Sequence, residues 1–286
     1  MPRPAPAHLV ADARRRGPGV RDHRPGRGAG RLPGALRPEG QGRGMRDQLI
    51  GNVAPVLSIL LDPGESVVAE AGEFSWMSDS IQVTPPAADG TGDPPGAPGR
   101  SPVPLSTYAA TGTAGTVAFA AKLPGSIRAV HVTPGRDYLV HRHGFLAGTA
   151  GIQVGTGFRQ VLGPGVFAAG GFVLHRISGE GRAWIELGGE VVPWPLAAGQ
   201  SVRVHPGHVG MFEATVSFQV MRVPGMANRY FAGDTHYFAV LSGPGRAWLQ
   251  SVPLPVLAAP LAPYLDGLAR SPAPPVTPLP DHHITD

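Results

Sequence analysis

Cysteine is absent from the 286 residues of the chain, and several other residue types are scarce. The absence of cysteine excludes a disulfide framework, a thiolate zinc site, an iron–sulfur cluster and a cysteine nucleophile. Lys122 is the sole lysine among 24 basic residues, and aromatic residues make up 7% of the chain. Few aromatics leave little material for a surface that stacks nucleic-acid bases. The longest uncharged apolar run, residues 247–265, contains four prolines and is therefore a poor membrane-spanning helix.

Glycine and proline are abundant instead, with 41 and 33 copies, about a quarter of the chain. This density disfavours long helices and favours turn-rich β structure. From Leu49 onward, short apolar runs alternate with turns such as DPGE, LPGS, TPGRD and SGPGR. The runs occupy residues 56–61, 66–70, 115–123, 127–132, 183–187 and 201–205. This pattern predicts an all-β protein, either a sandwich or a barrel.

Basic charge is concentrated at the start of the chain. Residues 1–44 hold ten arginines against three acidic residues, a net +7, whereas the whole chain is +4, so the remainder is −3. These residues contain no aromatic side chain and too little apolar surface to offset the entropy of ordering. We predict a disordered basic extension ahead of a biological start at Met45, with a genuine basic tail as the alternative.

The body is predicted to be an all-β domain over residues 45–269. Within it, residues 84–104 contain seven prolines and four glycines and are predicted to form an inserted flexible loop. Residues 270–286 contain five prolines and end in DHHITD, which predicts a disordered tail.

Internal repetition is the most informative feature of the body. One element occurs three times, as GESVVAEAG, GRDYLVHRHG and GQSVRVHPG, starting at Gly64, Gly135 and Gly199. A second element occurs twice, as SGEGRAWIEL at 178–187 and SGPGRAWLQS at 242–251, an offset of 64 residues. The same offset separates Gly135 from Gly199. We therefore predict an internally duplicated domain.

Alignment of the repeats assigns side chains to faces, because successive residues of a strand point to opposite sides. One face is apolar in every copy and is predicted to lie in the core: Val67 and Ala69, Tyr138 and Val140, and Val202 and Val204. The opposite face carries a polar residue at one equivalent position: Glu70, His141 and His205. The second face is therefore predicted to be polar surface.

The large aromatic side chains are predicted to pack in the core or in interfaces. Trp184 and Trp248 occupy the same repeat position, so both are expected to pack across the duplicated halves. Replacing Trp248 with alanine is expected to destabilise the fold by roughly 3–5 kcal/mol. The remaining candidates in apolar strand contexts are Trp76, Trp194, Phe172, Phe212 and Phe218.

Three segments of the body carry an ordered set of short motifs. These are Pro63, Gly64, Glu65, Glu70, Gly72, Trp76 and Met77; then Pro124, Gly125, Ile127, Phe145, Leu146 and Ala147; then Gly243, Pro244, Gly245, Trp248, Leu249, Gln250 and Ser251. In this order they resemble the altered-inheritance-of-mitochondria family over nearly all of residues 49–265. The resemblance implies an internally duplicated double-stranded β-helix or β-sandwich that is TRAP-like, that is, related in fold to the tryptophan RNA-binding attenuation protein. It also implies homo-oligomers, mitochondrial members linked to inner-membrane organisation, and bacterial members with no established catalytic residues.

A metal site of the cupin kind is the sharpest enzymatic hypothesis. Gly135 begins the spacing G-x5-H-x-H, which places His141 and His143 on one side of a strand, where both can chelate one ion. A looser second motif begins at Gly199 and ends at His208. However, the glutamate expected four or five residues after His143 is missing, and the repeat alignment places His141 on the polar face. We therefore predict solvated or hydrogen-bonded surface histidines, with no metal, cofactor or catalytic residue.

The residues and the resemblance together favour a non-enzymatic, homo-oligomeric β scaffold or interaction protein with an unidentified protein partner. The lack of a signal sequence predicts a cytoplasmic location, with any membrane contact peripheral. One alternative is a cupin-like metal enzyme that uses His141 and His143. A second is an RNA-binding oligomer, although the net charge of −3 on the body opposes strong phosphate binding.

Overall fold

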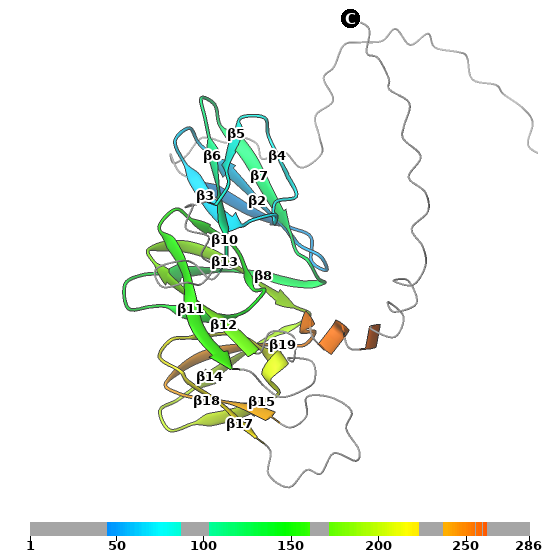
Figure 1. Ribbon diagram of the computed structural model, residues 1–286, viewed down its shortest axis with the longest axis vertical. Helices are drawn as coiled ribbons and strands as arrows, with labels where there is room; N and C mark the ends of the chain where they lie inside the picture. The colour runs from blue at the N-terminus through cyan, green and yellow to red at the C-terminus, as the bar shows by residue number, and fades with distance from the viewer. Residues whose placement is uncertain are drawn as a thin grey trace, which may run out of the picture. The chain divides into compact units, whose positions relative to one another are not determined.

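The computed structural model describes residues 45–86, 103–160, 172–222, 237–254, 256–258 and 260–261, and Figure 1 shows how its strands are arranged. The predicted extension 1–44 and tail 270–286 lie outside these ranges, as do residues 87–102 of the predicted loop. The two ends of that loop belong to the domain, because Thr84 closes a strand and Val103 is buried. The all-β prediction is confirmed, since strands dominate the described residues. No described helix is long and apolar enough to cross a membrane.

After strand β1 (Arg46–Ile50), the strands form three consecutive units of six. Unit 1 comprises β2 (Val56–Leu61), β3 (Ser66–Glu70), β4 (Trp76–Met77), β5 (Ile81–Thr84), β6 (Leu105–Ala110) and β7 (Gly115–Ala120). Unit 2 comprises β8 (Gly125–Val132), β9 (Tyr138–His141), β10 (Phe145–Thr149), β11 (Ile152–Gln160), β12 (Phe172–Gly179) and β13 (Gly181–Gly188). Unit 3 comprises β14 (Val191–Leu196), β15 (Ser201–Val204), β16 (Val209–Glu213), β17 (Ser217–Arg222), β18 (Tyr237–Ser242) and β19 (Gly245–Gln250), with a short 3-10 turn η1 (Pro206–His208) before β16.

Each unit divides its strands between two antiparallel sheets. The first sheet has the order β1-β2-β7-β4 and the second β5-β6-β3-β10-β13-β8. The third has the order β11-β12-β9-β16-β19-β14 and the fourth β15-β18-β17. The first, sixth and third strands of a unit thus form half of one sheet, and its second, fifth and fourth strands form half of the next. The second and third sheets combine halves from consecutive units, whereas the first and fourth contain only one such half.

Strand registers show that the three units are copies of one another. Three glycines at the start of a unit's sixth strand pair with three apolar residues: Gly115 with Leu61, Gly181 with Val132, and Gly245 with Leu196. Three further pairs join the third and sixth strands: Trp76 with Ala118, Ala147 with Trp184, and Met211 with Trp248. From unit 2 to unit 3 all of these residues advance by 64 positions, the interval seen in the sequence. The predicted duplication therefore extends to a third copy.

The first repeated element owes its initial glycine to the turn that leads into each unit's second strand. Gly64, Gly135 and Gly199 have φ angles of 89°, 84° and 80°. Glycine adopts this left-handed conformation without the steric cost that a Cβ atom imposes. The structure thus shows a repeated sandwich of antiparallel sheets, while the TRAP-like relation and the double-stranded β-helix stay predictions.

Three hydrophobic cores draw their residues from successive pairs of sheets. The first joins the first and second sheets and includes Leu57, Val67, Ala69, Tyr108, Phe119 and Trp184. The second joins the second and third sheets and includes Val130, Tyr138, Val140, Phe145, Ile185 and Met211. The third joins the third and fourth sheets and includes Phe172, Leu174, Val204, Phe212, Leu241 and Ala247, with Val202 and Phe218 packed against it. The predicted apolar face and the three phenylalanine predictions are confirmed.

Candidate functional site

Titratable side chains gather where unit 1 meets unit 2, in a group that we call the joint cluster. It comprises His141, His143, His175, Glu186 and Lys122. His141 ends β9 and His143 follows in the turn to β10, while His175 lies on β12, which pairs with β9. Glu186 lies on β13, and Lys122 follows the last strand of unit 1. The cluster therefore contains both histidines of the predicted cupin-like motif.

Glu186 fastens the turn that follows unit 1. Its Oε1 accepts hydrogen bonds from the backbone N–H groups of Lys122 (2.8 Å) and Leu123 (3.1 Å). Its Oε2 is buried and has no hydrogen-bond partner among the described residues. Burial disfavours the charged form and raises the pKa of the Glu186 carboxyl, against the opposing effects of the Lys122 ammonium and the two N–H donors. One oxygen of this carboxyl is therefore a structural acceptor, and the other is suited to hold a proton.

Gln250 occupies the position of Glu186 one unit later, 64 residues along the chain. Its Oε1 accepts a hydrogen bond from the backbone N–H of Gly188 (3.0 Å). Its Nε2 donates a hydrogen bond to the carbonyl oxygen of Gly207 (3.1 Å). An amide makes both contacts because it carries an acceptor and a donor, whereas an ionised carboxylate only accepts. The shared acceptor role identifies this position as a clamp between consecutive units.

Two histidines make parallel hydrogen bonds to the backbone at these clamps. The Nε2–H group of His141 donates to the carbonyl oxygen of Glu186 over 3.0 Å. The Nδ1–H group of His208 donates to the carbonyl oxygen of Gln250 over 2.8 Å. Both acceptors are carbonyl oxygens, so the bonded nitrogen carries the proton in each ring. His141 and His208 thus serve successive joints rather than one site.

Two imidazoles of the joint cluster are held in the neutral form. Burial lowers the pKa of His141 to about 4, although its bond to a backbone carbonyl opposes the shift. Burial also lowers the pKa of His175 to about 4, and the positive charges of Arg142 and His143 add to the shift. Burial lowers the pKa of His143 as well. Of the two predicted alternatives, solvated or hydrogen-bonded histidines, His141 follows the second: it is half-buried and bonds the backbone of β13.

The predicted cupin-like ligands are not brought to one place. His141 and His143 lie at the first joint, while His208 lies at the second and bonds Gln250. In the described part of the chain, no three histidine, aspartate or glutamate side chains are arranged to hold a metal ion. Burial at the joint cluster shifts both Glu186 and His141 toward their uncharged forms.

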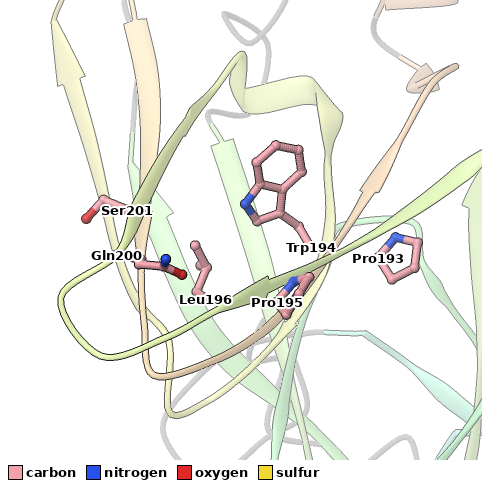
Figure 2. Close-up of a pocket in the computed structure, with 6 residues that line it drawn as sticks. All are labelled: Pro193, Trp194, Pro195, Leu196, Gln200 and Ser201. Atoms are coloured by element: carbon pink, nitrogen blue, oxygen red, sulfur yellow. The ribbon is translucent and has the colours of Figure 1, made fainter.

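A groove opens beside Trp194 on β14, the edge strand of the third sheet (Figure 2). It has a volume of about 650 Å³ and is lined by Pro193, Trp194, Pro195, Leu196, Gln200 and Ser201. Two of the polar lining atoms have partners within the domain: Gln200 Oε1 accepts the N–H of Ala197, and Ser201 Oγ bonds Ser242 Oγ. None of the lining side chains is titratable. The groove therefore suits an apolar side chain better than a reacting group.

Exposed large apolar side chains belong to units 1 and 3 and to the segments beside them. Trp76 on β4 is 55% exposed and Trp194 on β14 is 42% exposed, so neither lies in a core of this chain. The others in or beside unit 1 are Leu49, Ile50, Val53, Phe74, Met77 and Val83, and those in or beside unit 3 are Val192, Met221, Leu254, Val256 and Leu261. Among the described residues, unit 2 exposes no large apolar side chain. The sequence predicts that the tryptophans pack in the core or in an interface. The exposure of Trp76 and Trp194 is compatible with the second alternative and not with the first.

Sequence reasoning missed His175, Glu186 and the groove. His175 interrupts the apolar run FVLHRI, and Glu186 interrupts AWIEL. A polar residue inside an apolar strand signals a buried group that has found a partner, and this signal was available. The groove had no sequence signal, because it forms between residues of β14 and the start of β15.

Comparison with known proteins gives one family and one fold. The family model for mitochondrial biogenesis AIM24 matches residues 48–252. None of the curated proteins compared matches the chain. Among solved structures, the chain is similar to the X-ray crystal structure of protein SPYM3_0169 from Streptococcus pyogenes, with 20% sequence identity and a TM-score of 0.63. The match covers 77% of this chain and 100% of that one, and at this identity it supports the fold alone.

Proposed function

The chain belongs to the mitochondrial biogenesis AIM24 family, and we propose that it acts as a non-enzymatic, self-associating β scaffold or interaction protein. One observation carries the proposal: the exposed large apolar side chains of the described residues belong to units 1 and 3 and to the segments beside them, and not to the middle unit. Repeat proteins need polar outer faces on their terminal repeats to remain soluble. Trp76 on β4 and Met221 on β17 lie on edge strands of the first and fourth sheets, so these exposed apolar side chains favour a protein contact there.

The joint cluster supports the same proposal. The side chains of Glu186 and His141 form hydrogen bonds with backbone groups of a neighbouring turn and strand. Gln250 and His208 repeat this arrangement at the next joint with different side chains. The carboxylate of Glu186 and the amide of Gln250 both accept a backbone N–H group from the preceding unit. This shared contact connects consecutive units. The cluster thus contributes to rigidity of the array, which is what a scaffold requires.

Self-association is tested by measuring molar mass over a range of concentrations. We expect sedimentation equilibrium of the full chain to give a mass well above 29.7 kDa that falls on dilution. Trp194→Ser serves as the interface variant and is expected to reduce the mass toward that of one chain. A mass of one chain at every concentration would overturn the proposal.

The absence of a resident catalytic metal is a separate part of the proposal. Elemental analysis of protein purified without chelator is expected to give well under a tenth of an equivalent of iron, manganese, nickel or zinc. One equivalent that is lost in the His141→Ala/His143→Ala double variant would support the metal-enzyme alternative instead. Cytoplasmic location, peripheral membrane contact and the lack of strong nucleic-acid binding stay predictions.

A further inference from the structure

The first and fourth sheets are incomplete in complementary ways. In the second sheet, the second strand of unit 1 pairs with the third strand of unit 2, as β3 with β10. The third sheet repeats this junction one unit later, as β9 with β16. The fourth sheet ends at β15, a second strand, and the first sheet ends at β4, a third strand. We propose that β15 of one copy of the chain pairs with β4 of another copy, so that the two half-sheets form one continuous sheet.

The internal junctions specify the register of this pairing. In the first junction, Ala147 pairs with Ala69 and Gly148 with Val68. In the second, the equivalent residues pair again, as Met211 with Val140 and Phe212 with Leu139. Carrying the equivalence one step further places Trp76 opposite Val204, Met77 opposite Arg203, and Ser78 opposite Val202. A shift by one residue would reverse every side chain, so the register is a strict expectation.

Burial at the equivalent positions explains why Trp76 is exposed in a single copy. Ala147 and its partner Ala69 both belong to the first core, and Met211 and its partner Val140 both belong to the second. Val204, the expected partner of Trp76, belongs to the third core. In the proposed junction the Trp76 indole therefore enters the third core of the neighbouring copy.

Trp194 gives an independent reason for the same contact. It is equivalent to Val130 and Ile59, which are 7% and 0% exposed in the second and first cores. Trp194 is 42% exposed and lines the groove beside the start of β15 (Figure 2). Among the described strands, no second half-sheet extends the fourth sheet. The first sheet of another copy supplies such a half-sheet, and its face away from the first core carries Trp76, Leu60 and Ile50 beside polar Gln48 and Arg46.

The free edges differ in how open they are to pairing. The edge strand β14 contains Pro193 and Pro195, which lack the N–H groups that an added strand would use. Strands β4 and β15 contain no proline. The contact joins two different surfaces of the same chain, so it is heterologous and generates rings or filaments. This inference rests on the proposed self-association and adds the surfaces and register that would produce it.

Disulfide trapping tests the register directly, because the natural chain has no cysteine. Full-length Met77→Cys and Arg203→Cys variants are mixed in equal amounts and oxidised gently. We expect a disulfide-linked dimer containing one chain of each kind, since directly opposed residues place their Cβ atoms within reach of a disulfide. The matched control replaces Arg203→Cys with Val202→Cys, whose side chain points to the other face. The control mixture is expected to give at least tenfold less linked dimer.

Each other outcome has a defined meaning. Linked dimers formed by either variant alone would indicate a symmetric edge contact and would overturn the head-to-tail pairing. Multimers by sedimentation without the mixed disulfide would leave self-association standing and overturn this register. A single-chain mass at every concentration would overturn both the inference and the proposed self-association.

Discussion

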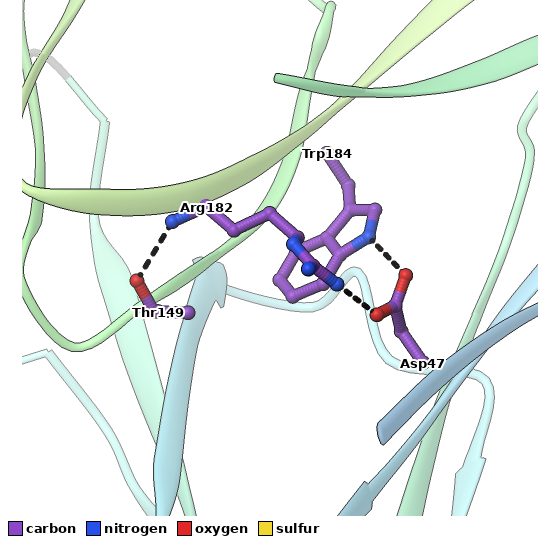
Figure 3. A network of polar contacts seen from close by, with 4 residues as sticks. All are labelled: Asp47, Thr149, Arg182 and Trp184. Atoms are coloured by element: carbon purple, nitrogen blue, oxygen red, sulfur yellow. Dashed lines mark hydrogen bonds and ion pairs between the residues drawn. The ribbon is translucent and has the colours of Figure 1, made fainter. Parts of the chain in front are cut away.

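The indole Nε1 of Trp184 donates a hydrogen bond of 3.1 Å to Oδ2 of Asp47, and the Arg182 guanidinium pairs with the other carboxylate oxygen (Figure 3). Asp47 lies on β1, ahead of the three units, whereas Trp184 lies on β13 of unit 2. Trp184 itself is fully buried in the first core. One carboxylate therefore ties the first strand of the domain to the second sheet.

Loss of this carboxylate is expected to weaken the first core. Asp47→Ala should lower the free energy of unfolding by about 2–3 kcal/mol, because it leaves a buried indole N–H without its acceptor. Urea unfolding followed by tryptophan fluorescence measures the change. Asp79→Ala, at an exposed position, is the matched control and should change the value by less than about 0.5 kcal/mol. Equal midpoints for the two variants would contradict the role assigned to Asp47.

The two equivalent tryptophans of the sixth strands differ in burial, so their truncation should differ in cost. Trp184→Ala should destabilise by about 3–5 kcal/mol, as for a fully buried aromatic side chain. Trp248 is only partly buried against the second core, so Trp248→Ala should cost about 2–3 kcal/mol, less than its sequence position alone predicts. Chemical denaturation compares them. A larger loss for Trp248 than for Trp184 would show that the burial difference does not control stability.

Exchange of the two clamp residues should move stability in opposite directions. Glu186→Gln is expected to raise the free energy of unfolding at neutral pH by about 1–2 kcal/mol, because burial disfavours a carboxylate charge that an amide does not carry. Gln250→Glu, the reciprocal variant, should lower it. Because the pKa of Glu186 is raised in the folded state, its contribution to stability is fully present below pH 4.5, the ordinary pKa. This contribution is lost as pH rises through the folded-state pKa. That decline should vanish in Glu186→Gln, and its persistence would contradict the assignment.

The neutral histidines should make the fold sensitive to acid. The pKa of His141 is about 4 against an ordinary 6.5, so its contribution is fully present above pH 6.5 and is lost as pH falls toward 4. His141→Gln should flatten the stability profile in this window by about 2–3 kcal/mol. His131→Gln, at an exposed histidine of β8, should leave the profile unchanged. Thermal unfolding between pH 4 and 8 tests both variants, and parallel profiles for His141→Gln and the natural chain would refute the burial of His141.

Turn glycines and alternating apolar residues were enough to predict strands, cores and repetition. Gly64, Gly135 and Gly199 mark equivalent turns because only glycine meets their positive φ without strain. The first unit was not recognised as a full copy, because Ala118 stands where the other units have tryptophan. The equivalence of unit 1 to the other two units is seen in the strand register, which requires the three-dimensional structure.

The candidate sites depended on contacts between distant residues. Glu186 meets the backbone of Lys122 across 64 positions, and no local pattern records that meeting. In the sequence, Trp76 and Trp194 stand among apolar residues, as buried strand residues do. That sequence context predicts burial for both. Among the described strands, the first sheet, which carries Trp76, and the fourth sheet, which faces the third sheet of Trp194, each contain one half only. Both indoles are therefore exposed, for a reason that depends on the whole array.

The most direct test of self-association through the two ends is a complementation measurement. Trp76→Lys blocks the first end and Trp194→Lys blocks the last, both at exposed positions where the fold should tolerate a charge. Each variant alone should sediment as a single chain, while an equal mixture should form dimers and nothing larger, since one variant supplies an intact β4 surface and the other an intact β15 surface. Val53→Lys, at an exposed apolar position beside the start of β8 and not on β4, should assemble like the natural chain. A mixture that stays at the mass of one chain, while the natural chain assembles, would contradict association of one end with the other.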